Sequence, residues 1–221
     1  MELHVPHGSI RTVKDFLVHI GIVIVGVIIA LGLSQIVEAY HRSRMAAESL
    51  EGFRREISFA QSQVKLVLDS IPAWRSQIDA EIARLSAPTE GADSKPIRYP
   101  EPAFQIIRKA SWDTAIATQI IAALPHDKVR GYELAYEELT IFVDEERIGV
   151  GYWYDLNKYG ESDAALNAED RRALVKELRR YKAFAWFLEA LGTDALKICD
   201  SALKVSLQPN SGSGERMDSG R

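Results

Sequence analysis

The residues whose types and spacing could do chemistry are few, and the clearest pair is Glu38 and His41. A carboxylate and an imidazole three residues apart share one face of a helix, as in the Glu-x-x-His pairs of di-iron helical bundles. Such a site needs two of these motifs and two further carboxylates, and this motif occurs singly. We therefore interpret both residues as polar groups at a membrane boundary, beside Tyr40, whose ring suits the headgroup level.

The other histidines give no stronger catalytic or metal pattern. His4 and His7 supply two ligands in a tail, which do not make a closed metal site. His126 follows Pro125 and precedes Asp127, an arrangement typical of a helix start. Because no phosphate loop, nucleophile elbow or paired-histidine motif occurs, we predict no catalytic, cofactor-binding or metal residues and no enzyme activity.

The charged residues indicate solvated surfaces. The net charge of −4 provides no basic field for nucleic acid, so we expect no nucleic-acid partner. Local charge clusters could be docking patches, but long helices normally carry such charges on their outer faces, and we favour that reading. The clusters are Asp144 to Glu146, Arg54-Arg55, Arg171-Arg172 and Arg179-Arg180. The lone Cys199 permits no internal disulfide and is expected to be a small buried helix residue.

The element that would position everything else is an apolar run from Phe16 to Leu33, which carries no charge. Thirteen of its eighteen residues are Ile, Val, Leu or Phe, which together favour insertion by about 5 kcal/mol. Extended to Val37, the run has 22 residues and a helical length of roughly 33 Å, the thickness of a bilayer core. We predict a transmembrane helix at 16–37 with the lipid bilayer as its partner. A cleaved signal peptide is the alternative, since Ala30, Gly32 and Ser34 are small.

One face of this predicted span carries small residues. Gly26, Ala30 and Ser34 recur at four-residue spacing, and His19 lies about 20° from Gly26 around the helix axis. Small residues allow two membrane helices to approach closely. We call these four residues the association face and expect a second copy, or another membrane protein, to bind there.

The two flanks of the span carry nearly equal numbers of basic residues, so their charge hardly favours one orientation. Arg11 and Lys14 precede it, and Arg42 and Arg44 follow it. A short basic leader usually stays inside, while long domains translocate with little regard to charge. We therefore expect a cytoplasmic N-terminus and an extracytoplasmic body.

Beyond the span, no proline interrupts residues 38–71, and apolar residues recur there with a mean spacing of 3.5. This spacing is typical of a coiled coil or a long antiparallel bundle. Pro72 should then kink or restart the helix. We call the apolar positions the seam: Ala46, Leu50, Phe53, Ile57, Ala60, Val64, Val67 and Ile71.

The remaining chain shows the same helical periodicity. We expect a loop at about 86–102, a helix capped by Ser111 and ending near Leu124, and a third helix from Asp127 toward Tyr159. Asn167 and Asp170 form an approximate capping box for a last helix that ends near Leu207. The predicted fold is all-α, with a transmembrane helix continuous with a long amphipathic helix in an antiparallel helical bundle. Its parts are a tail (1–15), the span (16–37), the bundle domain (38–208) and a disordered tail (209–221).

Three segments resemble a group of uncharacterised bacterial single-pass membrane proteins. They are Phe16-Leu-Val-His-Ile, Gly26-Val-Ile-Ile-Ala-Leu-Gly and Ala110-Ser-Trp-Asp-Thr-Ala-Ile-Ala-Thr, within roughly the first 125 residues. The resemblance implies a location in the bacterial inner membrane and no catalytic residues. Trp112 belongs to the third segment, where an aromatic anchor of the bundle and a binding residue are both open readings.

Two functions fit these patterns. The first is a membrane-anchored interaction or scaffold protein that self-associates through the association face and the seam. The second is an extracytoplasmic ligand-sensing helical bundle that signals through a separate membrane partner.

Overall fold

The computed structural model describes residues 13–87, 99, 107–161 and 166–207, and within them the protein is entirely helical. This confirms the all-α prediction. The elements are α1 (Val13–Ser86), α2 (Ala110–Ala117), the 3-10 helix η1 (Ile120–Ala123), α3 (His126–Asn157), the 3-10 helix η2 (Lys158–Glu161) and α4 (Ala168–Leu207). Most of the predicted tail at 1–15, most of the loop at 86–102 and the whole tail at 209–221 lie outside the described residues.

The chain divides into two compact units, Met1–Ala47 and Glu48–Arg221. In the first unit α1 exposes its large apolar side chains from Phe16 to Val37. By length and composition this part of α1 is able to cross a membrane, although a signal sequence near an N-terminus would satisfy the same criterion.

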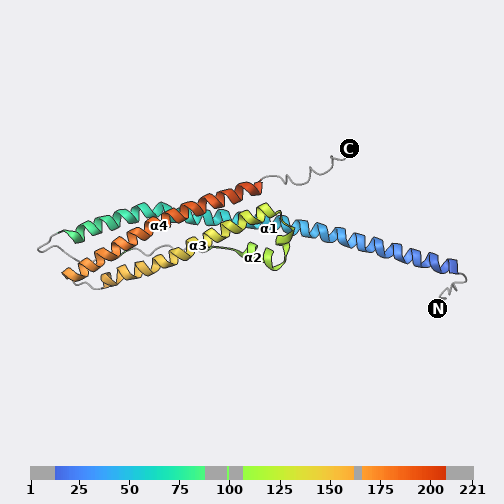
Figure 1. The fold of residues 1–221 in the computed structure, drawn as a ribbon, viewed down its shortest axis with the longest axis horizontal. Coiled ribbons are helices and arrows are strands. Elements are labelled where there is room, and N and C mark those ends of the chain that lie inside the picture. The colour runs from blue at the N-terminus through green and yellow to red at the C-terminus, as the bar shows by residue number, and fades with distance from the viewer. Residues whose placement is uncertain (1–12, 88–98, 100–106, 162–165, 208–221) are drawn as a thin grey trace, which may run out of the picture. The chain divides into compact units, whose positions relative to one another are not determined.

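The second unit is built from the later part of α1 together with α2, α3 and α4 (Figure 1). Residues later in α1 make polar contacts with residues earlier in α4. Gln61 Nε2 donates to Asp200 Oδ1 (2.7 Å), and Arg75 Nη1 donates to Glu189 Oε2 (2.8 Å). The Arg171 side chain reaches Leu85. α3 and α4 share an extensive interface along their lengths.

The seam lies inside this unit. Of its seven positions beyond Ala47, six are at most 4% exposed, and Leu50 is half-buried. Phe53 is covered by aromatic rings from α2 and α3, while Leu68 and Phe142 meet over Gly192. A Cβ at Gly192 would lie 2.8 Å from both of those side chains, so the glycine permits close packing of three helices.

Cys199 is buried on α4, as the sequence predicts. Its neighbours along the same stripe of α4 are buried as well, which explains why the helix keeps a 3.5-residue spacing of small and apolar side chains. Burial raises the pKa of the Cys199 thiol to about 12. The buried stripe comprises Leu174, Leu178, Tyr181, Ala185, Leu188, Gly192, Ala195, Cys199 and Ala202.

The helix expected to be capped by Ser111 starts and ends differently. α2 begins at Ala110, so Ser111 lies inside it, and the Ser111 N–H donates to Glu56 Oε1 (2.8 Å) instead of being capped locally. Gln119 has φ 58°, in the left-handed region, where an α-helix cannot continue. The chain therefore turns after α2, and the stripe expected to reach Leu124 passes through η1.

Pro72 and the end of α3 complete the comparison of boundaries. α1 runs through Pro72, so the predicted restart is wrong, and the predicted kink stays a prediction. The proline removes one backbone hydrogen bond, but buried Ile71 and Ile78 hold the helix against the core on both sides. α3 ends at Asn157, and the predicted extension toward Tyr159 is the 3-10 helix η2.

Candidate anion-binding groove

A groove forms where α4 begins beside the end of α1, and Asn167 fixes the start of α4. Its Oδ1 accepts hydrogen bonds from the N–H groups of Glu169 and Asp170, both at 2.9 Å. Its Nδ2 donates to Asp170 Oδ2 (2.7 Å). These bonds satisfy N–H groups that the first turn of a helix leaves free, so the predicted capping arrangement of Asn167 and Asp170 is confirmed.

Arg171 joins this first turn of α4 to the last turn of α1. Its Nη2 donates to the carbonyl oxygens of Leu85 (2.6 Å) and Ala87 (3.0 Å). The C-terminal carbonyls of a helix have no partner within the helix and carry partial negative charge. The guanidinium therefore caps α1 from another element and sets the distance between the two helix ends.

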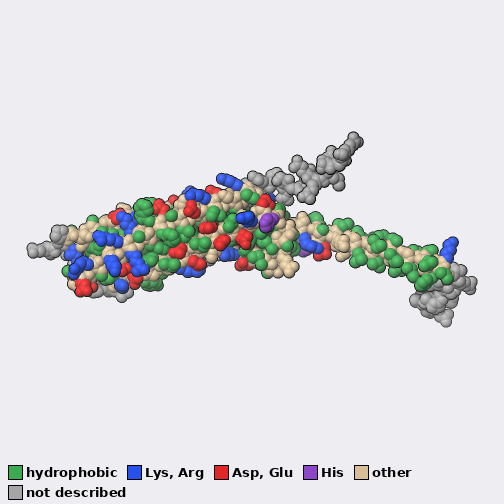
Figure 2. Space-filling model, in the orientation of Figure 1, with side chains coloured by type: hydrophobic (Ala, Val, Ile, Leu, Met, Phe, Trp, Pro, Cys, Tyr) green, Lys and Arg blue, Asp and Glu red, His purple; other side chains and the backbone are tan. Residues whose placement is uncertain are grey.

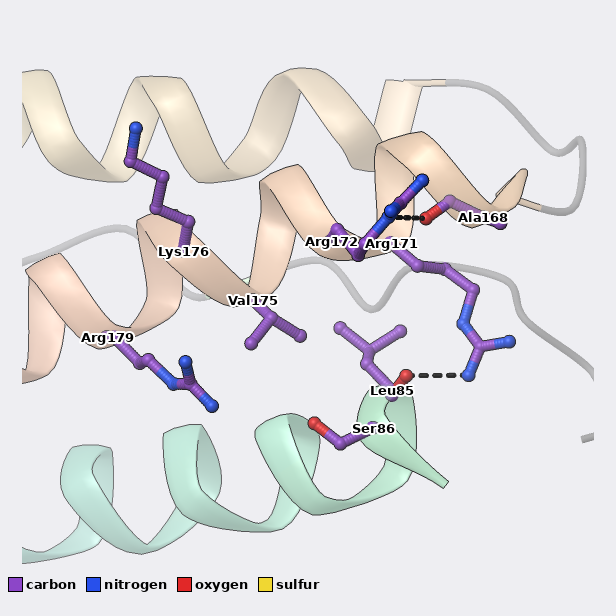
Figure 3. Close-up of a pocket in the computed structure, with 8 residues that line it drawn as sticks. All are labelled: Leu85, Ser86, Ala168, Arg171, Arg172, Val175, Lys176 and Arg179. Carbon is purple, nitrogen blue, oxygen red and sulfur yellow. Dashed lines mark hydrogen bonds between the residues drawn. The ribbon is translucent and has the colours of Figure 1, made fainter. Parts of the chain in front are cut away.

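The space between these helix ends is a solvent-open groove of about 610 Å³ (Figure 3). This volume lies within the range of small-molecule sites. Figure 3 shows the Val175 and Leu85 side chains pointing toward one another between the helices, with Arg171 and Arg179 at opposite ends. We call this space the groove; it is lined by Leu85, Ser86, Ala168, Arg171, Arg172, Val175, Lys176 and Arg179.

The charge of the described lining residues is entirely positive. Arg172 Nε donates to the Ala168 carbonyl (3.1 Å), which leaves the two terminal nitrogens of that guanidinium without a described partner. Lys176 and Arg179 are exposed and make no ion pair with any residue that the structure describes. Figure 2 shows Lys and Arg side chains gathered over the beginning of α4.

Several cations elsewhere on α1 and α4 are paired with carboxylates. Arg75 pairs with Glu189 (2.8 Å) and also lies over the Trp186 ring (4.2 Å). Lys182 pairs with Asp79. The described lining of the groove, by contrast, holds four cations and no carboxylate.

These groups can bind negative charge on an apolar floor. Guanidinium groups present planar donor pairs that match carboxylate and phosphate oxygens, and the lysine ammonium adds a point charge. Leu85 and Val175 supply apolar surface between the cations. The arrangement suits an organic anion whose body is aliphatic.

The polar residues considered for a metal site do not gather. Glu38 Oε1 accepts a hydrogen bond from Arg42 Nη2 (2.7 Å), one turn further along α1. Among the residues with described positions, no three His, Cys, Asp or Glu side chains form a cluster that could hold a metal ion. His4 and His7 lie outside the described residues.

The association face lies in the first unit and is uncovered there. His19, Ala30 and Ser34 are exposed, and a Cβ at Gly26 would meet nothing within 4 Å. The binding of a partner helix to this face stays a prediction. For the seam, burial within one copy weighs against its use by a second copy, because the helices of the second unit would first have to separate.

Trp112 lies in an aromatic cluster of the second unit. Its ring centroid is 5.3 Å from that of Phe53 and 5.2 Å from that of Tyr136. Tyr136 also donates to Glu56 Oε2 (2.6 Å). These contacts favour the reading of Trp112 as an aromatic anchor that fixes α2 to α1 and α3.

The groove was missed by sequence reasoning, although part of its signal is visible. Arg172, Lys176 and Arg179 follow one another at spacings of four and three residues, which places them along one side of a helix. As local charge clusters, Arg171-Arg172 and Arg179-Arg180 indicate only a solvated outer face of the helix. Nothing in the local sequence indicates that Leu85, more than eighty residues earlier, forms the opposite wall.

Comparisons with known proteins returned no matching family, no matching curated protein and no matching solved structure. The functional argument therefore rests on the groove and on the apolar segment of α1.

Proposed function

We propose that this chain is a single-pass membrane protein whose helical bundle binds a small organic anion. The observation that carries the binding role is the groove, whose described lining holds four cations, two apolar side chains and no carboxylate. This function corresponds to the ligand-sensing reading of the sequence. Any signal would pass to a separate membrane partner.

The bundle is inferred to be antiparallel. The polar contacts between α1 and α4 support this arrangement, because Gln61 contacts Asp200 whereas Arg75 contacts Glu189. For α3 and α4, Gly131 lies near Ala202 and Gly149 lies near Phe184, which gives the same opposed order.

The membrane anchor is tested by charging the centre of the apolar segment. We expect the full chain to stay in the bacterial inner membrane after an alkaline wash, and the variant Val25→Arg, Ile28→Arg to leave it. Each arginine costs about 2.5–3.5 kcal/mol near a bilayer centre, which together offsets the estimated insertion energy. The control is Val25→Leu, Ile28→Leu, which keeps the segment apolar.

The same experiment separates an anchor from a signal peptide. An anchor leaves the membrane-bound protein with its N-terminal segment intact by mass, whereas loss of residues before Gly32 or Ser34 would contradict the proposal. A reporter fused after Leu207 gives the side of the membrane. We propose an extracytoplasmic body, so activity of a cytoplasmic reporter would contradict that orientation.

Anion binding is tested on the full chain in neutral detergent, with octanedioate and inorganic phosphate as probes. At a hundred times the dissociation constant, a bound probe stabilises the fold by about 2.7 kcal/mol, which raises the melting temperature by roughly 5–10 °C. We expect this rise with at least one probe. The variant Lys176→Gln, Arg179→Gln should show a smaller rise, because both cations line the groove.

A matched control removes the same charge elsewhere. Arg55 and Arg130 are exposed on α1 and α3 and do not line the groove. The variant Arg55→Gln, Arg130→Gln should keep the full rise in melting temperature. An equal loss in both double variants would show that the probes respond to net charge, and the groove would have no specific role.

An interaction protein that self-associates through the association face is the second candidate. The uncovered face at Gly26 supports it, since a Cβ there would meet no atom of the same chain. A scaffold of this kind would show no change in melting temperature with either probe. The titration therefore discriminates between the two functions.

A further inference from the structure

We propose that the ligand of the groove is an organic dianion, with one oxyanion group at each end of an aliphatic chain. This inference rests on the proposed function, because it assigns a ligand class to the same groove. It follows from the order in which charge and apolar surface alternate along the groove.

The two ends of the groove are cationic. Arg171 and Arg179 are eight residues apart on α4, which corresponds to roughly 12 Å along the helix axis. Figure 3 places these two guanidinium groups at opposite ends of the space, whereas Arg172 turns toward Ala168 and Lys176 extends away from Leu85. Each end thus has one guanidinium for one oxyanion.

The middle of the groove is apolar. Val175 is half-buried and Leu85 is buried, and their side chains point toward one another between the two arginines. A charged or strongly polar group placed there would lose water without gaining a hydrogen bond, whereas methylene groups would gain from burial. The middle therefore selects an aliphatic segment.

The two ends differ in how they are held. Arg171 is fixed through its two bonds to the carbonyls at the end of α1, so little conformational freedom is lost when its remaining donors bind an oxyanion. Arg179 is exposed and makes no hydrogen bond with the described part of the chain. A monoanion would be satisfied at the Arg171 end and would leave Arg179 unused, whereas a dianion engages both.

The test compares two probes that share one aliphatic body. Octanedioate carries two carboxylates, and its monomethyl ester carries one. In calorimetric titrations of the full chain in neutral detergent, we expect the diacid to bind at least about tenfold more tightly than the monoester, as for one charge-assisted hydrogen-bonded contact. Inorganic phosphate, which lacks the aliphatic body, should bind more weakly than the diacid.

The variant Arg179→Gln identifies the second contact. It should weaken diacid binding to the level of the monoester and leave the monoester nearly unchanged, so the difference between the two probes disappears. Arg130→Gln, an exposed arginine outside the groove, should preserve the difference. Both variants alter exposed side chains, and circular dichroism without probe verifies that the helical content is kept.

The outcomes separate this inference from the proposed function. Equal affinities of the wild-type chain for diacid and monoester, with binding still weakened in Lys176→Gln, Arg179→Gln, would overturn the dianion and keep an anion-binding groove. Absence of binding for diacid, monoester and phosphate alike would overturn both. The comparison of the two probes on the wild-type chain requires no variant. It therefore tests the dianion proposal even if a substitution disturbs the fold.

Discussion

Replacement of Phe53 by alanine is expected to lower the free energy of unfolding by about 3–5 kcal/mol. Phe53 is 0% exposed, and its ring centroid lies 5.3 Å from those of Trp112 and Tyr132. Truncation removes a large buried side chain and leaves a cavity among rings from α2 and α3. Chemical denaturation of the full chain in neutral detergent, followed by circular dichroism, measures the loss.

The control is the same substitution on an exposed phenylalanine. Phe187 on α4 is 51% exposed, so Phe187→Ala should change the free energy of unfolding by less than about 1 kcal/mol. The pair also separates two readings of the seam. If Phe53→Ala dissociated an oligomer without destabilising the fold, the seam would be an interface between copies, and its burial within one chain would not be its main role.

The second large effect is a loss of stability at alkaline pH. Burial raises the pKa of Tyr99, Tyr136 and Tyr181, the last to about 12. For Tyr136, the hydrogen bond from its hydroxyl to Glu56 adds to the effect of burial. Each folded-state pKa lies above the unfolded value of about 10, so the stabilisation is complete below pH 10 and is lost as the pH rises above it.

While all three phenols are protonated in the fold but ionised in the unfolded chain, stability should fall by about 4 kcal/mol per pH unit. Denaturation midpoints measured between pH 9 and 12, with phenolate absorbance as a second signal, give this slope. Tyr181→Phe removes one buried phenol and should reduce the slope by about a third. Tyr154 is 64% exposed, so Tyr154→Phe should leave the slope unchanged, and a slope that responded equally to both variants would contradict this assignment.

Much of the helical framework is readable from spacing and capping residues. The seam residues of the second unit recur every three or four positions because one side of α1 is covered by the other helices. Asn167 is recognisable as the start of α4 because its side chain satisfies local N–H groups. Signals of this kind depend on residues within one or two helical turns, and the sequence displays them directly.

Features that depend on residues far apart in the sequence could not be predicted in this way. Trp112, Ile116 and Ile120 have the spacing of one helix face, yet Ile116 is 51% exposed and the chain turns at Gln119. That turn places Ile120 in the core, so tertiary burial outweighs the local pattern. The groove is a second such feature, because Leu85 and Arg179 line it from two helices that are far apart in the sequence.

The hydrogen bonds between Arg171 and the end of α1 link the binding of a ligand in the groove to the fraying of the last turn of α1. When the last turn of α1 frays, its carbonyls release the guanidinium, and the end of the groove that is held most firmly loses its geometry. A ligand that requires Arg171 in place therefore binds the closed state more tightly and suppresses fraying by the same free energy. Amide hydrogen exchange near Leu85 would then slow as the groove fills, so the end of this helix reports occupancy of a site formed mainly by another helix.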